Sequence, residues 1–371
     1  MNIILAFDKF RDSLTACEAA EATRSGLLEI SPEFNIHAFQ LADGGEGSLK
    51  ILAAAYHCHL TQITTQNAIH KPSRSVVAFN EKTKVAILEM AQHVGLAQLS
   101  ADERNPMKTS SFGVGEAIRQ VLNWGAAEII IGVGGSATND GGAGMMDAMG
   151  YQFLNKKGKT IHPNGGNLHE IDRIVTPSSF PKVQITLASD VANPLTGRNG
   201  ATYTYGPQKG AREEDLLFLE NNIKHLASKV QEVSSSKVLN REGYGAAGGF
   251  PLCACELLGA KIKSGSQLIF HRLKIAEIIR QSSVVITGEG KIDGQTSFGK
   301  AITPVLECAR EHGKKIILVC GVYESEDTFM SGLKRYELSR LASEMNLDSF
   351  RDAYLLGCEA GRQIAAGLKE L

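Results

Sequence analysis

A glycine-rich segment, GVGGSATNDGGAG at residues 132–144, carries the strongest chemical signal in this sequence. It follows an apolar run that predicts a strand and precedes an apolar run, 145–149, that predicts a helix. A turn of this kind exposes consecutive backbone N–H groups beside a helix N-terminus, and together these bind anions such as phosphate. We therefore predict a phosphate-binding loop made of Gly134, Gly135, Ser136, Thr138, Asn139, Gly141 and Gly142.

Two other interpretations of this segment stay open. Gly132, Gly134 and Ala137 match the weak dinucleotide fingerprint G-x-G-x-x-A, whereas the chain contains no Walker A sequence. The segment is also compatible with a tight turn packed under another loop. Asp140 lies inside it, and an acidic residue close to a phosphate indicates a metal ion or an acid–base role.

Four further segments are rich in glycine: LADGGEG (41–47), SSFGVGEA (110–117), GYGAAGG (243–249) and TGEGKIDGQTSFGK (287–300). In an open α/β sheet, the loops after the carboxyl ends of strands line the ligand site. Acidic residues in two of these loops are therefore predicted to bind substrate, namely Asp43, Glu46, Glu289 and Asp293. The alternative for each of them is a helix N-cap or a solvated charge.

Two more segments place a charged residue where it could do chemistry. In ASDVANPLTGRNGA (188–201), Asp190 directly follows a predicted strand, a position that suits a general base or a metal ligand. In YGPQKGA (205–211), Lys209 stands between turn-forming residues. It is a candidate cation for a substrate or a phosphoryl group.

The first predicted strand ends in a third charged segment, AFDKFRDSLTA at 6–16. It places Asp8, Lys9 and Arg11 beside the start of a predicted helix. This pattern suits a small carboxylate or a phosphate. An N-cap in the same segment is compatible with that role.

The residue types collected so far are those that phosphoryl transfer needs. The reaction requires donors for the phosphate chain, a cation, carboxylates for Mg²⁺ and a group that orients the attacking hydroxyl. All of these occur on glycine-bounded loops of the chain. The residues by themselves do not identify the acceptor.

These loops need a scaffold, and the two ends of the chain predict a parallel sheet. Apolar runs alternate there with helical patterns, which favours a sheet covered on both faces. We predict a flavodoxin-like α/β domain from residues 1–60 and 281–371. Its predicted strands are 2–7, 35–40, 283–287, 315–320 and 336–342, and its predicted helices are 13–28, 47–56, 300–312, 326–333 and 349–368.

The middle of the chain predicts a second domain inserted into the first. Short strands joined by polar turns favour an α/β domain with a mixed sheet over residues 61–280. The predicted strands are 62–65, 75–80, 84–89, 128–132, 183–189 and 201–204. The serine run 234–236 is expected in a surface loop, and we expect the active site in the cleft between the two domains.

Composition excludes several classes of function. The chain has 371 residues, about two domains, and 40 acidic residues balance 39 basic ones. This balance argues against a general nucleic-acid or membrane-surface binder. Seven scattered cysteines and an N-terminus without a secretory pattern predict a reduced, cytoplasmic protein. We expect no metal at His57-Cys58-His59 or at the Cys253-Ala254-Cys255 pair.

Taken together, the segments resemble the bacterial glycerate kinase family, whose members have their own two-domain α/β fold. Eight motifs occur in order over essentially the whole chain: DKFRDSLTA, LADGGEG, TSSFGVGEAI, IGVGGSATNDGGAGM, SDVANPLTGRNGA, YGPQKGA, GAAGG and GEGKIDGQTSFGK. One departure is at the start, where the family usually reads APDSFKGSL and Lys9 replaces a serine. If that position contacts substrate, the selectivity for the acid differs.

The resemblance implies an ATP-dependent D-glycerate kinase that commonly forms 2-phosphoglycerate. ATP and Mg²⁺ are then the expected cofactors, and the loop 132–144 would hold the nucleotide phosphates. On chemical grounds we assign Asp190 as the base or a Mg²⁺ ligand and Asp140 as a further metal ligand. Lys9, Arg11 or Lys209 would face the substrate carboxylate or the transferring phosphoryl group.

Two rival functions are a dinucleotide-dependent hydroxy-acid oxidoreductase and a non-catalytic metabolite-binding regulator. The first depends only on the G-x-G-x-x-A match, and the first strand carries no glycine fingerprint. The second does not require the acidic loops. The expected partners are D-glycerate and ATP, with no nucleic acid and no membrane, in a monomer or small homo-oligomer.

Overall fold

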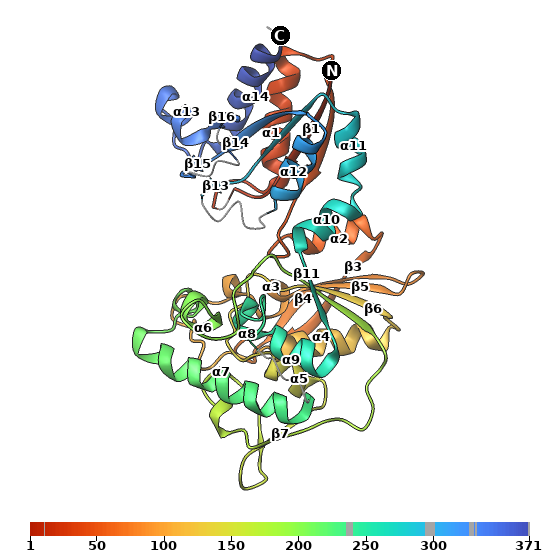
Figure 1. The fold of residues 1–371 in the computed structure, drawn as a ribbon, viewed down its shortest axis with the longest axis vertical. Helices are drawn as coiled ribbons and strands as arrows, with labels where there is room; N and C mark the ends of the chain where they lie inside the picture. Colours follow the sequence, from red (N-terminus) through yellow and green to blue (C-terminus); the bar gives the residue numbers. More distant parts are fainter. Residues whose placement is uncertain (11, 235–239, 294–300, 326–329, 331, 370–371) are drawn as a thin grey trace. The chain divides into compact units, whose positions relative to one another are not determined.

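The computed structural model describes residues 1–369 except 11, 235–239, 294–300, 326–329 and 331. The chain forms two compact units (Figure 1). The terminal unit comprises residues 1–43 and 266–371, and the central unit comprises residues 44–265. In the described part of the chain, no helix has the length and apolar character needed to cross a membrane.

The terminal unit contains a five-stranded parallel sheet in the order β16-β14-β12-β1-β2. Numbered along this unit, the strands lie in the order 2-1-3-4-5, which is the flavodoxin-like arrangement. The predicted fold class is therefore confirmed for this unit. The strands are β1 (Asn2–Phe7), β2 (Asn35–Gln40), β12 (Val284–Gly288), β14 (Lys315–Cys320) and β16 (Lys334–Glu337).

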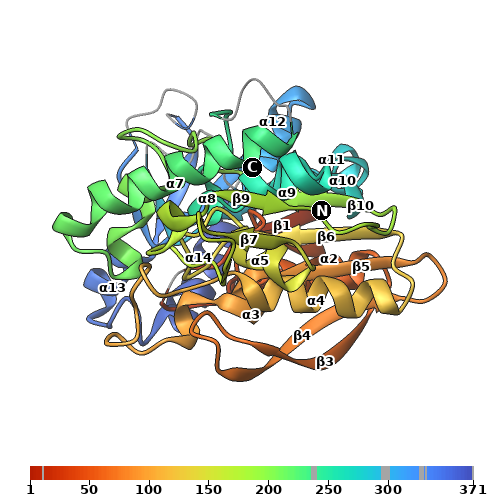
Figure 2. The same ribbon diagram turned by 90° about the horizontal axis from the view of Figure 1, so that it is seen from below.

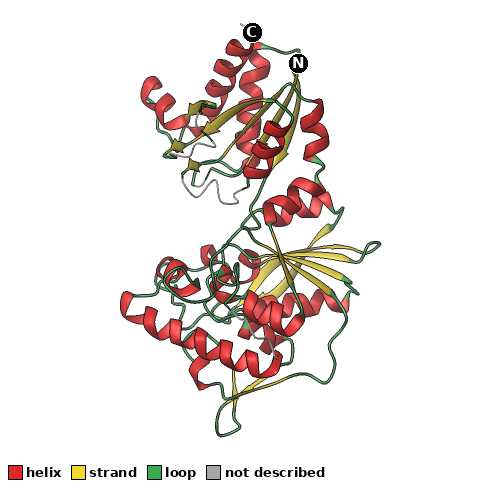
Figure 3. Cartoon of the chain, viewed as in Figure 1, coloured by secondary structure: helices red, strands yellow, loops and turns green. Residues whose placement is uncertain are grey.

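Helices cover both faces of this sheet (Figure 3). Ile3 and Leu5 of β1 belong to one apolar cluster with α1, α13 and α14, whereas Ile4 belongs to another with α11 and α12. Successive side chains of a strand point to opposite faces, so a continuous apolar strand requires both layers. The helices are α1 (Ala16–Ile30), α10 (Gly265–Arg272), α11 (Ile275–Gln281), α12 (Thr303–Glu311), α13 (Leu338–Met345) and α14 (Ala353–Lys369). A short parallel pair joins β13 (Lys291–Ile292) to β15 (Val322–Tyr323).

The central unit contains a mixed six-stranded sheet in the order β11-β10-β6-β5-β4-β3, as predicted. β3 and β4 form an antiparallel hairpin at one edge (Figure 2), and β5, β6, β10 and β11 run parallel. The strands are β3 (His59–Gln66), β4 (Pro72–Asn80), β5 (Val85–Glu89), β6 (Glu128–Gly132), β10 (Gln184–Ala188) and β11 (Lys261–Lys263). A small separate sheet contains β7 (Gln152–Leu154), β8 (Thr160–Ile161) and β9 (Arg173–Val175).

One apolar core unites the central sheet with its helices. Ile129 and Ile131 of β6 belong to the same buried cluster as Ile118 of α4 and Met145 of α5. The α-helices of this unit are α2 (Ser48–Ala55), α3 (Met90–Val94), α4 (Phe112–Asn123), α5 (Ala143–Ala148), α6 (Ala201–Tyr205), α7 (Glu213–Ser234), α8 (Ala246–Gly249) and α9 (Pro251–Leu258). Three short 3₁₀ turns are η1 (Leu96–Gln98), η2 (Leu168–Glu170) and η3 (Pro207–Lys209).

Two predicted strands are wrong. Residues 201–204 form helix α6, because a turn of helix buries Ala201 and Thr202 despite their neighbours' preference for strands. Residues 336–342 divide into the end of β16 and the start of α13, where Leu338, Leu341 and Ala342 are buried with helical spacing. The predicted helix 326–333 and the serine loop 234–236 lie largely outside the described residues.

In the sequence, the boundaries between the two units fall at 43/44 and 265/266. The predicted boundaries, 60/61 and 280/281, lie later in the chain. Helix α2 accounts for the first difference, because it packs against β4 and β5 of the central sheet. The terminal unit is thus closed by both ends of the chain, with α1 against α14.

The contact between α1 and α14 leaves no room for side chains at two glycines. A Cβ at Gly361 would lie 2.3 Å from the Thr23 carbonyl oxygen, and one at Gly26 would lie 1.9 Å from the Cys358 carbonyl oxygen. Both distances are shorter than any van der Waals contact, so these two helix backbones touch.

We expect Gly361→Ala to lower the free energy of unfolding by about 1–3 kcal/mol, because the methyl group forces the helices apart. Gly367→Ala in the same helix is the matched control, since its Cβ would meet only the mobile tip of Lys334. It should be neutral or stabilising by up to about 1 kcal/mol. Urea unfolding of both variants measures the difference, and equal stabilities would contradict the close packing.

Candidate functional site

The terminal unit brings three predicted site residues to one edge of its sheet. β1 and β12 are parallel neighbours with Phe7 paired to Gly288, so Asp8, Lys9 and Glu289 leave the sheet side by side. The amide of Asp8 donates a hydrogen bond to the carbonyl oxygen of Gly288 (3.0 Å), which ties the two strand ends together. This edge is the carboxyl end of the sheet, where the sequence predicts binding residues.

The other predicted site residues that the structure describes in the terminal unit lie in other loops. Asp43 follows β2, the next strand beyond β1, and is half-buried. Asp293 follows β13 and is half-buried too. Arg11 lies outside the described residues. Glu289 is buried, with only 7% of its surface exposed.

In the central unit, three parallel strands end together. Glu89 of β5 and Ala188 of β10 both pair with Gly132, the last residue of β6. The loop 132–144 therefore leaves the sheet next to Asp190, which follows β10. The structure thus brings these two predicted site elements to the same sheet edge.

The turn 44–47 lies directly on these strand ends. A Cβ at Gly44 would lie 2.3 Å from the Ala188 carbonyl oxygen, and a Cβ at Gly134 would lie 2.5 Å from the Gly45 Cα. The Gly134 amide donates to the Gly44 carbonyl oxygen (3.3 Å). Backbone contacts backbone here, so glycine is required. We call residues 44–47, 132–136 and 188–190 the strand-end junction.

The loop 132–144 has an accessible half and a buried half. Gly134 is half-buried, Gly135 is exposed with φ +73°, and residues 136–142 are buried. Within the accessible half, the Gly135 carbonyl oxygen accepts from the Leu96 amide (2.8 Å), which fixes the turn. The exposed Gly135, between the half-buried Gly134 and the buried Ser136, is therefore the part of the loop that a phosphate can approach.

The buried half of the loop is held from within the unit. Asn139 Nδ2 donates to Thr202 Oγ1 (3.1 Å), and Thr109 Oγ1 donates to the Ala137 carbonyl oxygen (3.0 Å). The packed-turn interpretation of the sequence describes this half. A direct contact between a nucleotide and the buried members of the predicted set would require the loop to open; these members are Thr138, Asn139, Gly141 and Gly142.

Asp140 is an internal anchor of the loop. One carboxylate oxygen accepts from the amide (2.7 Å) and hydroxyl (2.8 Å) of Ser111 and from the Gly144 amide (3.1 Å). The other accepts from the Gly142 amide (3.1 Å). Burial raises the pKa of Asp140 above its usual value, and these four donors oppose that shift. A carboxylate so fully engaged does not fit the predicted role of metal ligand.

Lys209, in η3, is buried beneath the same loop. Its ammonium group donates to the Thr138 carbonyl oxygen (2.7 Å) and to Ser136 Oγ (3.2 Å). Burial lowers the pKa of Lys209 from 10.5 to about 7, although the charge of Asp140 opposes this. The side chain therefore braces the loop, and in this conformation it does not face solvent.

The segment 243–249 supports the loop from behind. Gly248 has φ +70°, and a Cβ there would lie 2.0 Å from the Thr138 carbonyl oxygen. Its carbonyl oxygen accepts from the Gly141 amide (3.1 Å). This glycine-rich segment is thus explained by close backbone approach.

Asp190 differs from Asp140 because it is partly exposed. It stands at the strand-end junction, at the start of a loop that is held by several hydrogen bonds. Tyr205 donates its hydroxyl to Asn193 Oδ1 (2.8 Å), and the Gly197 amide donates to Glu220 Oε1 (2.8 Å). A partly exposed carboxylate at a strand end can take a proton or bind a cation.

Glu89 also belongs to this region, and it is absent from the residues predicted above. It is buried at the end of β5, and one of its carboxylate oxygens accepts from the Gly47 (3.1 Å) and Leu49 (2.9 Å) amides. The available signal is a charged residue that closes the apolar strand 84–89. Its partners are not detectable from the sequence, because they are backbone groups 40 and 42 residues away.

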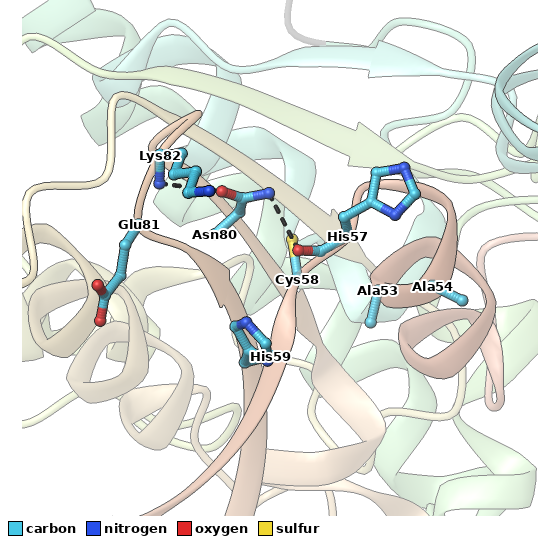
Figure 4. Close-up of a pocket in the computed structure, with 8 residues that line it drawn as sticks. All are labelled: Ala53, Ala54, His57, Cys58, His59, Asn80, Glu81 and Lys82. Atoms are coloured by element: carbon cyan, nitrogen blue, oxygen red, sulfur yellow. Dashed lines mark hydrogen bonds between the residues drawn. The ribbon is translucent and has the colours of Figure 1, made fainter.

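A surface pocket lies away from the strand-end junction, at the turn between α2 and β3 (Figure 4). Asn80 donates from Nδ2 to the His57 carbonyl oxygen there (3.0 Å). The lining residues are Ala53, Ala54, His57, Cys58, His59, Asn80, Glu81 and Lys82, none of them a predicted site residue. Among the described residues, no three His, Cys, Asp or Glu side chains gather to hold a metal.

Comparisons with known proteins agree on one family. A family model described as "Glycerate kinase family" matches residues 3–353. The chain is 37% identical to "Glycerate 2-kinase" of Escherichia coli, over 99% of this chain and 98% of that protein. It is 36% identical to "Glycerate kinase" of Bacillus subtilis, over 100% of this chain and 98% of that protein.

A solved structure has the same fold. The crystal structure of putative glycerate kinase 2 from Salmonella typhimurium superposes with a TM-score of 0.82 at 33% identity. The match covers 100% of this chain and 98% of that one. The two-domain α/β architecture is thus shared over the full length.

The burial of Lys209 predicts a pH dependence of stability. Because its pKa is lower in the folded chain, the unfolded chain binds more protons between about pH 7 and 10. Stability contributed by this group should therefore rise with pH across that window, by at most about 1.4 kcal/mol per unit.

Lys209→Met should remove this rise, and Lys156→Met, at an exposed lysine of the same unit, should keep it. Chemical unfolding of the three proteins at pH 7, 8, 9 and 10 gives the comparison. A constant stability difference between wild type and Lys209→Met at all four pH values would refute the buried-lysine assignment.

Proposed function

The chain belongs to the glycerate kinase family, and we propose that it transfers the γ-phosphoryl group of ATP to D-glycerate, forming 2-phosphoglycerate and ADP. The observation that carries this proposal is the near full-length match to kinases named for this substrate. The strand-end junction supplies groups that suit the reaction. The enzyme is a kinase that uses ATP and a small-molecule acceptor.

The accessible half of the loop 132–144 binds the nucleotide phosphates in this proposal. Gly135 is exposed and carries no side chain, so a phosphate can approach its backbone closely. Ser136 lies beside it, and Lys209 holds the serine hydroxyl from below. The buried half supports this turn through its hydrogen bonds to Thr109 and Thr202.

Asp190 acts as the base in this proposal. Its carboxylate accepts the proton of the 2-hydroxyl of glycerate as that oxygen forms a bond to the γ-phosphorus. The bond between the γ-phosphorus and its bridging oxygen breaks, and ADP leaves with the electron pair. A partly exposed carboxylate at a strand end suits this role, whereas the fully engaged Asp140 does not.

The site offers Mg²⁺ one carboxylate that suits it, Asp190. The ion usually keeps several waters and takes one or two carboxylates besides the substrate phosphates. Asp190 meets that need, and Mg²⁺ would supply charge neutralisation on the phosphates. Asp190 therefore has two compatible roles, base and Mg²⁺ ligand.

Several predictions stay predictions. They are the substrate-binding roles of Asp8, Lys9, Arg11, Asp43, Glu46, Glu289 and Asp293, the location of the active site, the cytoplasmic setting and the oligomeric state. The terminal unit supports the first of these only by placing Asp8, Lys9 and Glu289 at one sheet edge. Lys209 braces the loop, so its predicted contact with substrate would require a different loop conformation.

The activity is tested by incubating the protein with MgATP and D-glycerate and identifying the product by ³¹P NMR. We expect ADP and 2-phosphoglycerate. The phosphorus–proton coupling pattern distinguishes this product from 3-phosphoglycerate. Hydrolysis of ATP without any phosphoglycerate would refute the proposed function.

The role of Asp190 predicts that Asp190→Asn lowers kcat by about 10²–10⁴-fold with the fold intact. Asp172→Asn, at an exposed aspartate of the same unit, is the control and should keep wild-type turnover. Steady-state assays at several Mg²⁺ concentrations also separate the two roles, since added Mg²⁺ should rescue only a lost ligand. Wild-type turnover by Asp190→Asn would exclude both.

A further inference from the structure

We infer that Glu89 is a positioning residue for phosphoryl transfer: it fixes the turn 44–47 against the glycine loop without touching substrate. The inference rests on the proposed function, because it concerns the site that binds the phosphates there. It depends on three observations, which are the capping contact, the close backbone packing and the burial of the carboxylate.

The first observation is a helix cap supplied from a distant strand. The first amides of an α-helix lack partners within the helix and need acceptors elsewhere. At α2 the N-cap residue is Gly47, with φ +99°, which has no side chain to serve as a cap. One carboxylate oxygen of Glu89 accepts from the Gly47 (3.1 Å) and Leu49 (2.9 Å) amides instead.

The second observation is that the capped turn continues into the strand-end junction. Gly44 has no space for a Cβ against the Ala188 carbonyl oxygen, and Gly134 has none against the Gly45 Cα. A Cβ at Gly135 would also lie 4.0 Å from the Glu46 Cβ. A turn released from Glu89 can therefore move only by shifting the backbone that we propose binds phosphate.

The third observation is the burial of the group that makes the contact. Glu89 is only 1% exposed, and β5 pairs it with Gly132 at the start of the loop. A buried carboxylate is costly unless it is well hydrogen-bonded, so its two short bonds are favoured over alternatives. The contact thus sets one geometry of the turn relative to β6.

The same contact also determines where an anion can bind. A helix N-terminus attracts anions through its unpartnered amides and its dipole. At α2 the carboxylate of Glu89 already occupies two of these amides. The phosphate chain is therefore directed to the exposed turn at Gly135 and away from the start of α2.

The test compares Glu89→Ala and Glu89→Gln with a matched control. Asp348→Ala removes a carboxylate oxygen that likewise accepts from two backbone amides, those of Phe350 (2.9 Å) and Arg351 (2.8 Å). That aspartate belongs to the terminal unit, in the turn before α14. It is not among the predicted site residues, so its loss should leave turnover unchanged.

Kinetic constants are measured per folded molecule, at a temperature well below the melting point of every variant. Misplacing a site by about 1 Å costs roughly 100-fold in rate, so we expect kcat/KM for MgATP to fall by that order in Glu89→Ala. Glu89→Gln keeps an oxygen acceptor of the same size and should lose less. A residue with a purely structural role would lower the melting temperature and leave these constants unchanged.

Hydrogen exchange of the segment 44–55 provides the second readout. Glu89→Ala should accelerate exchange there, and Asp348→Ala should accelerate it only near its own turn. Wild-type kcat/KM in Glu89→Ala, an equal loss in Asp348→Ala, or unchanged exchange at 44–55 would each overturn the inference. If Glu89→Ala does not fold, Glu89→Gln decides by the same criteria.

A failure of this inference can be distinguished from a failure of the proposed function. If the wild-type protein forms no phosphoglycerate, the proposed function fails. The Glu89 variants are then judged on MgATP binding by calorimetry, where the same weakening is expected. Unchanged MgATP affinity in both variants would overturn the inference.

Discussion

The constraint on which the candidate site depends is the direct contact of three backbone segments at the carboxyl end of β6. The turn 44–47, the start of the loop 132–144 and the end of β10 approach so closely that Gly44 and Gly134 cannot carry a Cβ. Such contacts place peptide groups from distant parts of the chain side by side. The glycine content of the sequence is therefore a requirement of packing as much as of ligand approach.

Buried polar side chains hold this arrangement in place. Asp140 joins the loop to the start of α4, Lys209 braces it from below, and Glu89 fixes the adjoining turn. All three are charged types that are costly to bury, and each has short hydrogen bonds to backbone or hydroxyl groups. Asp190 is partly exposed and Glu46 is exposed at this edge, which separates the carboxylates suited to chemistry from the buried groups that support the loop.

Much of the fold was predictable, because local pattern and tertiary structure agree in the buried strands. β1, β2, β6 and β14 have the predicted bounds, since each is an apolar or alternating run between clear breaks. The strand predicted at 336–342 is wrong because Leu338, Leu341 and Ala342 follow a helical period, which a segment of seven residues is too short to show clearly.

The sequence predicts the site only as a set of loops. Which half of the loop 132–144 is buried depends on partners such as Thr109 and Thr202, far away in sequence, so local pattern could not show it. Glu89 was missed for the same reason.

The central claim is that phosphates bind at the accessible turn of the strand-end junction, with Asp190 beside them. A crystal structure with Mg²⁺ and a non-hydrolysable ATP analogue tests this most directly. The account predicts phosphate oxygens within hydrogen-bond distance of the backbone amide of Gly135, with the Gly134 amide still bonded to the Gly44 carbonyl oxygen and the buried half of the loop unchanged. Phosphates bound at the start of α2, or at the sheet edge that carries Asp8 and Glu289, would contradict it.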